Sequence, residues 1–322
     1  MANDSSSRFA VSIVVAFPSV LLNAGGVLGG VAGVPAILLC AGSIPRGCFP
    51  VFVPMYSRAL SRSMPVCLGI TTRNFWRVVN RNASVYDPYW SVQPAVILTF
   101  IFLNWIRVNK FVAGMFAFFG KEVESSLSPV AIYLFIAVIF WAVRLTANWA
   151  YNFKSFEYQD WRYVMLKEKT GRAYPLINFL GIHLFPTCVV YLCVLPAVIA
   201  YSQGVRFGFV SAIFITVSLF AAIVQGLADI QMHKFRNSGV GGFNRTGLWK
   251  NARHPNYACE ILMWWGVGLA SVSTLGWNYW YLLAGALVNT LMFLFVSIPM
   301  ADKRQSRKPG FEDYKKETRM LI

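Results

Sequence analysis

Charged residues are scarce in this chain of 322 residues: they make up 13% of it, against 57% hydrophobic residues. A composition this apolar argues against a soluble domain and is typical of a protein that crosses a membrane several times. Acidic residues are fewer than basic ones: the 13 Asp and Glu residues against 29 Lys and Arg residues give a formal net charge of +16. Because no basic run carries the motif of a nucleic-acid module, we expect no nucleic-acid partner and attribute the charge to cytoplasmic loops.

Metal-binding patterns are also missing. The three histidines, at 183, 233 and 254, are too few for the multi-histidine boxes of membrane di-iron enzymes. None of the six cysteines forms a Cys-X-X-Cys pair, and several lie in apolar runs, which argues against a zinc site or a disulfide framework. The sequence therefore predicts no metal site.

Long apolar segments are what the chain does have. They predict an all-α, polytopic membrane protein with about seven transmembrane helices. A polar tail (1–10) precedes a single helical membrane domain (11–322), and a short apolar stretch (111–119) is expected at the interface. The predicted spans are residues 11–40, 92–106, 129–143, 178–202, 207–228, 257–275 and 279–300.

The loop charges predict the orientation of these spans. With seven spans, 24 of the 29 Lys and Arg residues fall on one side of the membrane. Basic loops stay in the cytoplasm, so we expect a lumenal or external N-terminus and a cytosolic C-terminus.

A polar stripe runs along the end of the predicted fifth span. Gln225, Asp229, His233 and Arg236 follow one another at intervals of four, four and three residues, which places them on one helix face. A carboxylate at the end of a membrane helix is costly unless it is paired or functional. The structural alternative is a pair of Asp229 with His233 or with Arg236.

The stretch GLWKNARHPNYACEILMWW (247–265) follows this stripe. Pro255 predicts a helix start, and Lys250 and Arg253 precede the N-terminus of that helix, which itself favours anions. Asn256 and Glu260 are four residues apart and share a face.

These residues together predict a site for a ligand with negative groups and a flat, hydrogen-bonding ring. Phosphates would contact Lys250, Arg253 and Arg236, and polar groups would contact Asp229, Asn256 and Glu260. The simpler alternatives are a helix-dipole role for Glu260, a capping role for His254 and interfacial anchoring by Trp249, Trp264 and Trp265.

Several motifs in this order resemble a known family. TGLWKNARHPNYACEILMWWG, together with VYDPYW, WAVRLTANW, DWRY, ADIQMHKFR and FEDYKKETRMLI, is similar to the steroid 5α-reductase superfamily, in particular to a less characterised branch of it. The similarity covers roughly residues 75–322.

This resemblance implies an oxidoreductase of lipid metabolism, with NADPH held in a cytosol-facing cavity of the C-terminal helices (207–322). It also implies hydride transfer to a carbon–carbon double bond conjugated to a carbonyl in a lipid or steroid-like substrate, in the endoplasmic reticulum membrane. Oligomeric state stays open. Motif positions and residue chemistry together give the expected cofactor-binding set: Gln225, Asp229, Arg236, Lys250, Arg253, His254, Asn256, Tyr257 and Glu260.

The substrate-facing half matches the family less well. The family's carbonyl-polarising Glu and Tyr have no placed counterpart, and IPMADKRQSRKPG lacks the His and Tyr that contact the cofactor after the last span. Asp87, Arg144, Asp160 and Tyr163 are the candidates for acid or carbonyl contacts, because all four are expected on the cytosolic side.

Two other functions remain open. Membrane methyltransferases of the isoprenylcysteine or phospholipid type, which use S-adenosylmethionine, also resemble the chain at RHPNY and have an acidic residue after the last span, here Asp302. A non-catalytic membrane protein with the same fold is the third possibility.

Overall fold

The computed structural model describes residues 83–99, 102, 129–153, 158–202 and 207–321. The predicted N-terminal tail, the first span (11–40) and the interfacial stretch (111–119) lie outside these residues. The described elements are η2 (Ala83–Tyr86), α5 (Pro129–Asn152), α6 (Trp161–Thr170), η3 (Gly171–Ala173), α7 (Tyr174–Ile177), η4 (Asn178–Leu184), α8 (Phe185–Ser202), α9 (Phe209–Asn237), η5 (Gly247–Lys250), α10 (Pro255–Leu275), η6 (Trp277–Leu283), α11 (Ala284–Met292), η7 (Phe293–Ser297), α12 (Ile298–Gln305) and α13 (Phe311–Glu317).

The described part of the chain is helical and contains no β-strand, which confirms the predicted all-α class. Five helical runs are long and apolar enough to cross a membrane: Pro129–Asn152, Trp161–Tyr201, Phe209–Asn237, Pro255–Leu275 and Trp277–Gln305. They correspond to the last five predicted spans. The predicted span 92–106 is helical over 92–99 and only partly described, so the count of seven stays a prediction.

The end of α5 differs from its predicted boundary. The sequence predicted a span that ends at residue 143, whereas α5 continues to Asn152. The polar segment RLTANWAYN therefore extends the helix rather than forming a loop. An apolar run indicates which part of a helix lies in lipid. The helix itself continues for as long as its backbone hydrogen bonds and packing support it.

The fold of the chain divides into two compact units, which are described separately. Unit 1 comprises Met1–Val96 and Thr146–Thr187, and unit 2 comprises Ile97–Leu145 and Cys188–Ile322. The single membrane domain stays a prediction.

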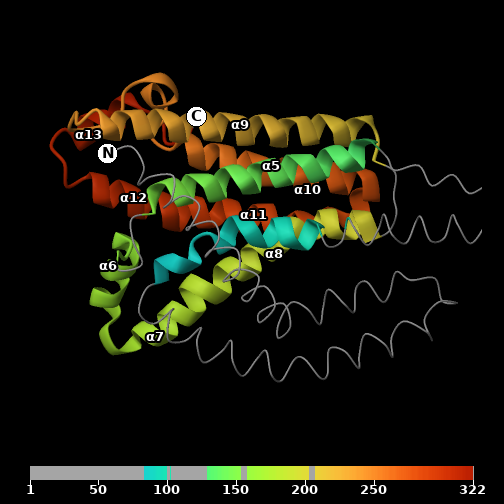
Figure 1. Ribbon diagram of the computed structural model, residues 1–322, viewed down its shortest axis with the longest axis horizontal. Coiled ribbons are helices and arrows are strands. Elements are labelled where there is room, and N and C mark those ends of the chain that lie inside the picture. Colours follow the sequence, from blue (N-terminus) through green and yellow to red (C-terminus); the bar gives the residue numbers. More distant parts are fainter. Residues whose placement is uncertain (1–82, 100–101, 103–128, 154–157, 203–206, 322) are drawn as a thin grey trace, which may run out of the picture. The chain divides into compact units, whose positions relative to one another are not determined.

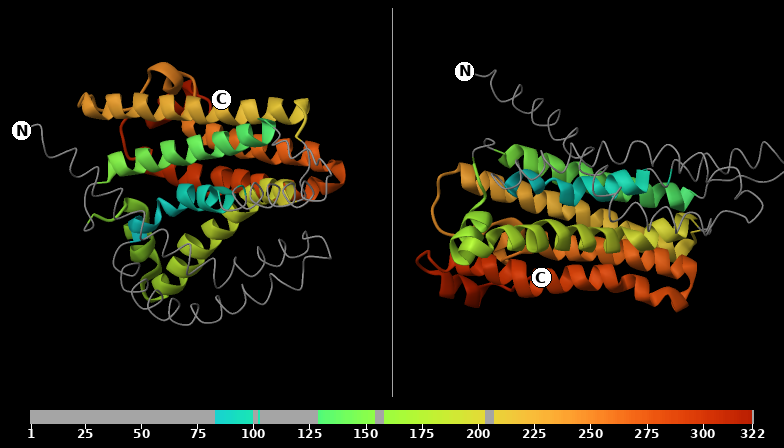
Figure 2. Two further views of the ribbon diagram at one scale, coloured as in Figure 1. Left: turned by 45° about the vertical axis from the view of Figure 1, so that its right-hand side comes forward. Right: turned by 90° about the horizontal axis from the view of Figure 1, so that it is seen from below.

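In unit 2, α9 and α10 run side by side (Figures 1 and 2). The two helices can approach closely because Gly266 lacks a side chain. A Cβ atom at this position would lie 2.1 Å from Ser218 Oγ and 2.7 Å from the carbonyl oxygen of Phe214. Ser218 Oγ also donates a hydrogen bond of 3.0 Å to the carbonyl oxygen of Met263, so α9 and α10 are joined by a polar contact as well as by packing.

The opposite face of α9 is apolar and exposed. Its outward residues recur every three or four positions, which is the spacing of one helix face. A continuous apolar face along a helix of 29 residues is expected against lipid tails. With the five apolar helices, this face shows a multi-pass membrane protein in a lipid bilayer. The exposed residues are Phe220, Ile223, Leu227 and Ile230.

In unit 1, α6 begins at a side-chain cap. The Asp160 carboxylate accepts a hydrogen bond of 2.9 Å from the backbone N–H of Arg162, which satisfies one of the free donors of the first turn. Farther along, Asn178–Leu184 forms a π-helical segment between α7 and α8. Such wide turns occur mostly as single insertions into helices and are frequent at functional sites.

A tight contact between α8 and α11 gives a first testable prediction. A Cβ atom at Gly285 would lie 2.3 Å from the backbone of Leu192, and a backbone atom cannot swing away as a side chain can. We expect Gly285→Ala to lower the stability of the detergent-solubilised protein by about 3 kcal/mol, measured as a fall in the thermal unfolding midpoint. Gly181→Ala is the control, because a Cβ atom there would meet nothing within 4 Å. Equal midpoints for both variants would contradict the packing.

Candidate functional site

A buried carboxylate occupies the centre of unit 2. Glu260 of α10 is only 2% exposed, and three side chains donate hydrogen bonds to it. Trp141 Nε1 of α5 lies 2.8 Å and Gln225 Nε2 of α9 lies 2.9 Å from Oε2, while Trp264 Nε1 lies 3.0 Å from Oε1. Three helices therefore contribute to one polar centre, as burial of a carboxylate requires.

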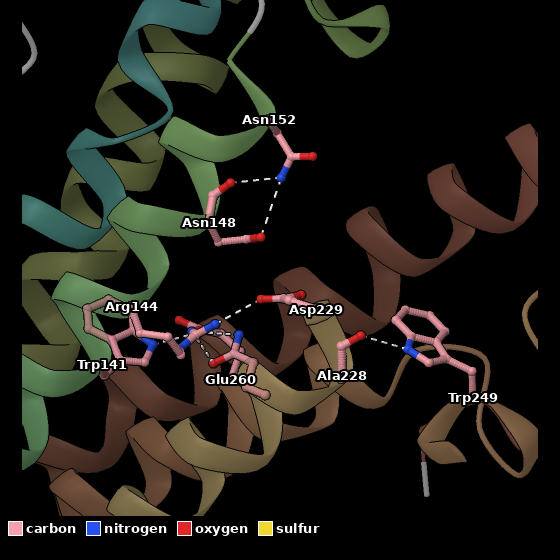
Figure 3. Close-up of polar contacts among 9 residues, drawn as sticks. Trp141, Arg144, Asn148, Asn152, Ala228, Asp229, Trp249 and Glu260 are labelled. Carbon is pink, nitrogen blue, oxygen red and sulfur yellow. Dashed lines mark hydrogen bonds and ion pairs between the residues drawn. The ribbon is translucent and has the colours of Figure 1, made fainter. Parts of the chain in front are cut away.

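Arg144 extends this centre toward the end of the helices. Its Nη1 donates to Asp229 Oδ2 at 2.8 Å, and its Nη2 donates to Gln225 Oε1 at 2.7 Å (Figure 3). The side chains of Arg144 and Asp229 are each 13% exposed, so this is a largely desolvated ion pair. The contacts connect Asp229, Arg144, Gln225 and Glu260 into one chain, which we call the α5–α9–α10 network.

A glycine makes room for this network. A Cβ atom at Gly226 would lie 3.0 Å from Arg144 Cδ, so a larger residue would push the arginine side chain away. Gln225 and Asp229 then present their polar atoms to Arg144 from one face of α9, four residues apart.

The loop before α10 is fastened to α9. Trp249 Nε1 donates a hydrogen bond of 2.9 Å to the carbonyl oxygen of Ala228 (Figure 3), and the backbone N–H of Leu248 donates to Gln231 Oε1 at 2.9 Å. Gly247 has a φ of +58°, a conformation that favours glycine, and a Cβ atom there would lie 2.5 Å from Gln231 Oε1. Trp249 is therefore a structural contact at 7% exposure rather than an interfacial anchor.

Arg253 holds the C-terminal tail, and both Arg253 and His254 contact Asp302 of α12. Arg253 Nη1 donates to the carbonyl oxygens of Thr318 at 2.7 Å and Lys315 at 3.1 Å. His254 Nε2 lies 2.9 Å from Asp302 Oδ1, and Arg253 Nη2 lies 3.5 Å from Asp302 Oδ2. Both basic side chains are buried, so the structure gives them partners within the chain.

Other basic side chains of unit 2, namely Arg236, Arg304 and Lys308, lie near one another. Arg236 lies in the last turn of α9 and Lys250 ends η5, and both are exposed. Lys308 Nζ donates a hydrogen bond of 3.1 Å to the carbonyl oxygen of Gly242. Burial lowers the pKa of Lys308, and the nearby charges of Arg304 and Arg236 lower it further. Arg236, Arg304 and Lys308 thus form a cationic cluster whose charges repel one another and which an anion would stabilise.

Asn256 and Tyr257 occupy the first turn of α10. Asn256 is half-buried, and its side chain has no hydrogen bond to a described residue. The Tyr257 ring stacks on His254, with centroids 5.2 Å apart and planes 5° apart. Helix α10 starts at Pro255, as the sequence predicted, and His254 occupies the N-cap position without a side-chain capping hydrogen bond.

Unit 1 contains a second acidic group. Tyr163 donates a hydrogen bond to Asp87 Oδ1, and Arg162 Nη2 lies 3.2 Å from Asp87 Oδ2 and its Nε 2.8 Å from Asp160 Oδ1. Burial raises the pKa of the Asp87 carboxyl, against the opposing effects of the Arg162 charge and the Tyr163 hydrogen bond. Three of the four proposed catalytic residues, Asp87, Asp160 and Tyr163, therefore lie together.

A family comparison covers all of these residues. The model of a family described as "Protein of unknown function (DUF1295)" matches residues 75–318. The chain belongs to this family. DUF1295 is related to steroid 5α-reductase-like proteins. A relative described as "Uncharacterized protein C594.04c", from Schizosaccharomyces pombe, is 27% identical over 232 residues. The match covers 62% of this chain and 62% of that protein. No solved structure matches.

In this DUF1295 chain, Arg144 pairs with Asp229 in unit 2. The alternative pairs of Asp229 with His233 or Arg236 were wrong, since Arg144 supplies the closest positive charge. Sequence reasoning also missed Trp141, Arg162 and Lys308. Trp141 precedes Arg144 by one helical turn, a signal that the predicted end of the span at 143 concealed.

No group of three or more His, Cys, Asp or Glu side chains that could hold a metal ion occurs among the residues with a described structure.

The ion pair of the network gives a second prediction. Arg144→Met leaves the Asp229 carboxylate buried without its partner, so we expect a loss of about 3 kcal/mol in stability. The double variant Arg144→Met/Asp229→Leu removes both charges and should recover most of that loss. The exposed pair Arg245–Glu317 serves as the control, because Arg245→Met should cost less than about 1 kcal/mol. Thermal unfolding of the four proteins checks this, and an Arg144→Met midpoint equal to that of the control would contradict it.

The tail contacts give a third prediction. Arg253→Met removes two hydrogen bonds to tail carbonyls, so we expect faster amide hydrogen exchange over 311–321. Lys250→Met is the matched control, since Lys250 is an exposed basic residue of the same loop. Unchanged exchange in the Arg253 variant would show that α13 is held by other contacts.

Proposed function

We propose that the protein is a membrane-bound, NADPH-dependent reductase of a carbon–carbon double bond in a lipid or steroid-like substrate. The observation that supports this best is the combination, within unit 2, of a cluster of three basic side chains and a buried acid–amide network. The first suits the phosphates of a dinucleotide, and the second suits a polar ring that must be oriented away from water.

The residues fit this cofactor at its phosphate end. Arg236 and Lys250 are exposed and have no described acidic partner, and Lys308 lies close enough to Arg236 for its pKa to fall. Neighbouring positive charges repel one another, and a bound phosphate would offset this repulsion. Arg253 and His254, in contrast, position the loop and the tail around the site rather than bind phosphate themselves.

The network fits a hydrogen-bonding ring. Asn256 has a free half-buried amide at the start of α10, and Glu260 lies one turn farther along. Tyr257 presents a ring held by its stack on His254. The bound cofactor would supply hydride, while Asp229, Gln225 and Glu260 would keep the network rigid and exclude water.

Reduction of a conjugated double bond also needs a group that donates to the carbonyl or supplies the second hydrogen. No donor is assigned to this role, because the single hydroxyl hydrogen of Tyr163 is already donated to Asp87. Arg162 fixes the Asp87 carboxylate, and Asp160 fixes Arg162, so Tyr163 is held in one orientation. By family analogy the reaction takes place in the endoplasmic reticulum membrane, with the C-terminus in the cytosol.

One contact favours a second candidate function. Asp302 lies against Arg253 and His254, so the RHPNY loop and the acidic residue after the last span form one structure. The methyltransferases that this chain also resembles carry both features and use S-adenosylmethionine. Calorimetric titration with NADPH and with S-adenosylmethionine separates the two functions, and binding of neither would support the non-catalytic alternative.

The cationic cluster gives the fourth prediction. Because Arg236 is exposed and makes no described ion pair, Arg236→Gln should leave the unfolding midpoint unchanged yet weaken NADPH binding about tenfold, through the loss of one charge-assisted contact. Lys316→Gln is the control, because this exposed side chain lies outside the cluster and is paired with Asp313.

Variants of the network complete the test. Asp229→Ala and Glu260→Ala should also weaken NADPH binding, which is compared only in samples whose secondary structure matches the wild type by circular dichroism. Wild-type affinity for NADPH in all three site variants would contradict the assignment of these residues to the cofactor site.

A further inference from the structure

The lipid-facing side of α9 ends in a basic residue. The exposed apolar side chains of this helix run from Phe209 to Ile230. Lys234 is the next exposed residue, and it lies on the same face because it follows Leu227 by seven residues and Ile230 by four. Its ammonium group makes no ion pair or side-chain hydrogen bond with a residue that the structure describes.

The apolar part of α9 has the length of a bilayer core. Ile230 comes 21 residues after Phe209, which is a rise of about 32 Å, and the hydrocarbon core of a bilayer is about 30 Å thick. Lys234 lies about 6 Å farther along the helix axis, since each residue adds about 1.5 Å. For a helix near the bilayer normal, the lysine side chain therefore reaches the level of the lipid headgroups.

Exposed aromatic side chains lie at the opposite end of unit 2. Ser211 Oγ, near the start of α9, lies 3.1 Å from Ser273 Oγ, near the end of α10, so these two helix ends lie together. The segment η6 follows α10 and exposes Trp277, Trp280 and Tyr281. Tryptophan and tyrosine are enriched at membrane–water interfaces. Aromatic residues at one end and a lysine at the other thus indicate the two boundaries of the hydrocarbon core.

The two basic residues in the last turn of α9 lie on different sides of the helix. Residues two positions apart are about 200° apart around a helix axis, so Lys234 and Arg236 lie on nearly opposite sides. Arg236 follows Asp229 by seven residues and shares its side, which is the side that contacts Arg144 of α5. Lys234 shares the side of the exposed apolar residues. The two cations are therefore available to different anions.

We propose that Lys234 binds the headgroup of an anionic phospholipid whose acyl chains lie along the apolar face of α9. The phosphate of such a lipid lies just outside the hydrocarbon core, at the level that the ammonium group reaches. Binding breaks no ion pair of Lys234 with a described residue. The predicted cytosolic position of this helix end agrees with the proposal, because anionic lipids are concentrated in the cytoplasmic leaflet.

Native mass spectrometry of the full-length protein in detergent tests this surface, with dioleoyl phosphatidylglycerol and dioleoyl phosphatidylcholine as probes. We expect the wild type to bind the first phosphatidylglycerol more tightly than the first phosphatidylcholine. Lys234→Gln should weaken that phosphatidylglycerol binding about fivefold, through the loss of one charge next to the headgroup, and leave phosphatidylcholine binding unchanged. Lys316→Gln is the matched control, because Lys316 is an exposed lysine of α13 and lies outside the apolar face of α9.

Two further measurements separate this surface from the proposed cofactor site. Arg236→Gln should keep wild-type affinity for phosphatidylglycerol, and Lys234→Gln should keep wild-type affinity for NADPH. The soluble compound sn-glycerol 3-phosphate has a phosphate but no acyl chains, so it should not displace the lipid.

The outcomes that overturn the lipid site are distinct. Equal affinity of the wild type for the two lipids, or wild-type phosphatidylglycerol binding in the Lys234 variant, would overturn it. An Arg236 variant that loses the lipid as the Lys234 variant does would also overturn it, because the headgroup would then occupy the cationic cluster. Displacement by sn-glycerol 3-phosphate would show a site for free phosphate instead. A protein that binds the lipid through Lys234 but does not bind NADPH would support this surface and contradict the reductase.

Discussion

The structure of unit 2 depends on one constraint, the burial of the Glu260 carboxylate. At 2% exposure it cannot be solvated, so donors must come from the neighbouring helices. Trp141, Gln225 and Trp264 supply them, and the two oxygens of the carboxylate thereby connect α5, α9 and α10. Apolar packing alone allows helices to slide or rotate by small amounts, whereas hydrogen bonds to one carboxylate define their positions.

The sequence predicted the parts of the fold that depend on local chemistry. Long apolar runs located five described spans, and Pro255 located the start of α10. The polar stripe on α9 was also readable, because helical spacing needs no knowledge of other helices. The partner of that stripe was not readable. Arg144 is 85 residues from Asp229, and sequence spacing carries no information about which helices meet at that distance.

The same limit applies to the RHPNY stretch. Its residues share a loop and a helix start, which favours one common role for all of them. The structure separates them instead: Arg253 and His254 turn to the tail, while Lys250 stays exposed and Asn256 keeps a free amide. Their partners decide this, and these lie far along the chain: Asp302 of α12 is 48 residues after His254, and Thr318 is 65 residues after Arg253.

This separation has a consequence for how the proposed cofactor site would act. Residues that are already paired, such as Arg144 and Arg253, fix the geometry of the site, because moving them would leave a buried charge without a partner. Residues that lack described acidic partners, such as Arg236 and Lys250, raise the affinity for an anionic ligand, because binding the anion breaks no existing ion pair. Variants of the first kind should therefore change stability and binding together, whereas variants of the second kind should change binding alone. A site with both kinds of residue can bind a charged ligand without first rearranging, which keeps the cost of association low.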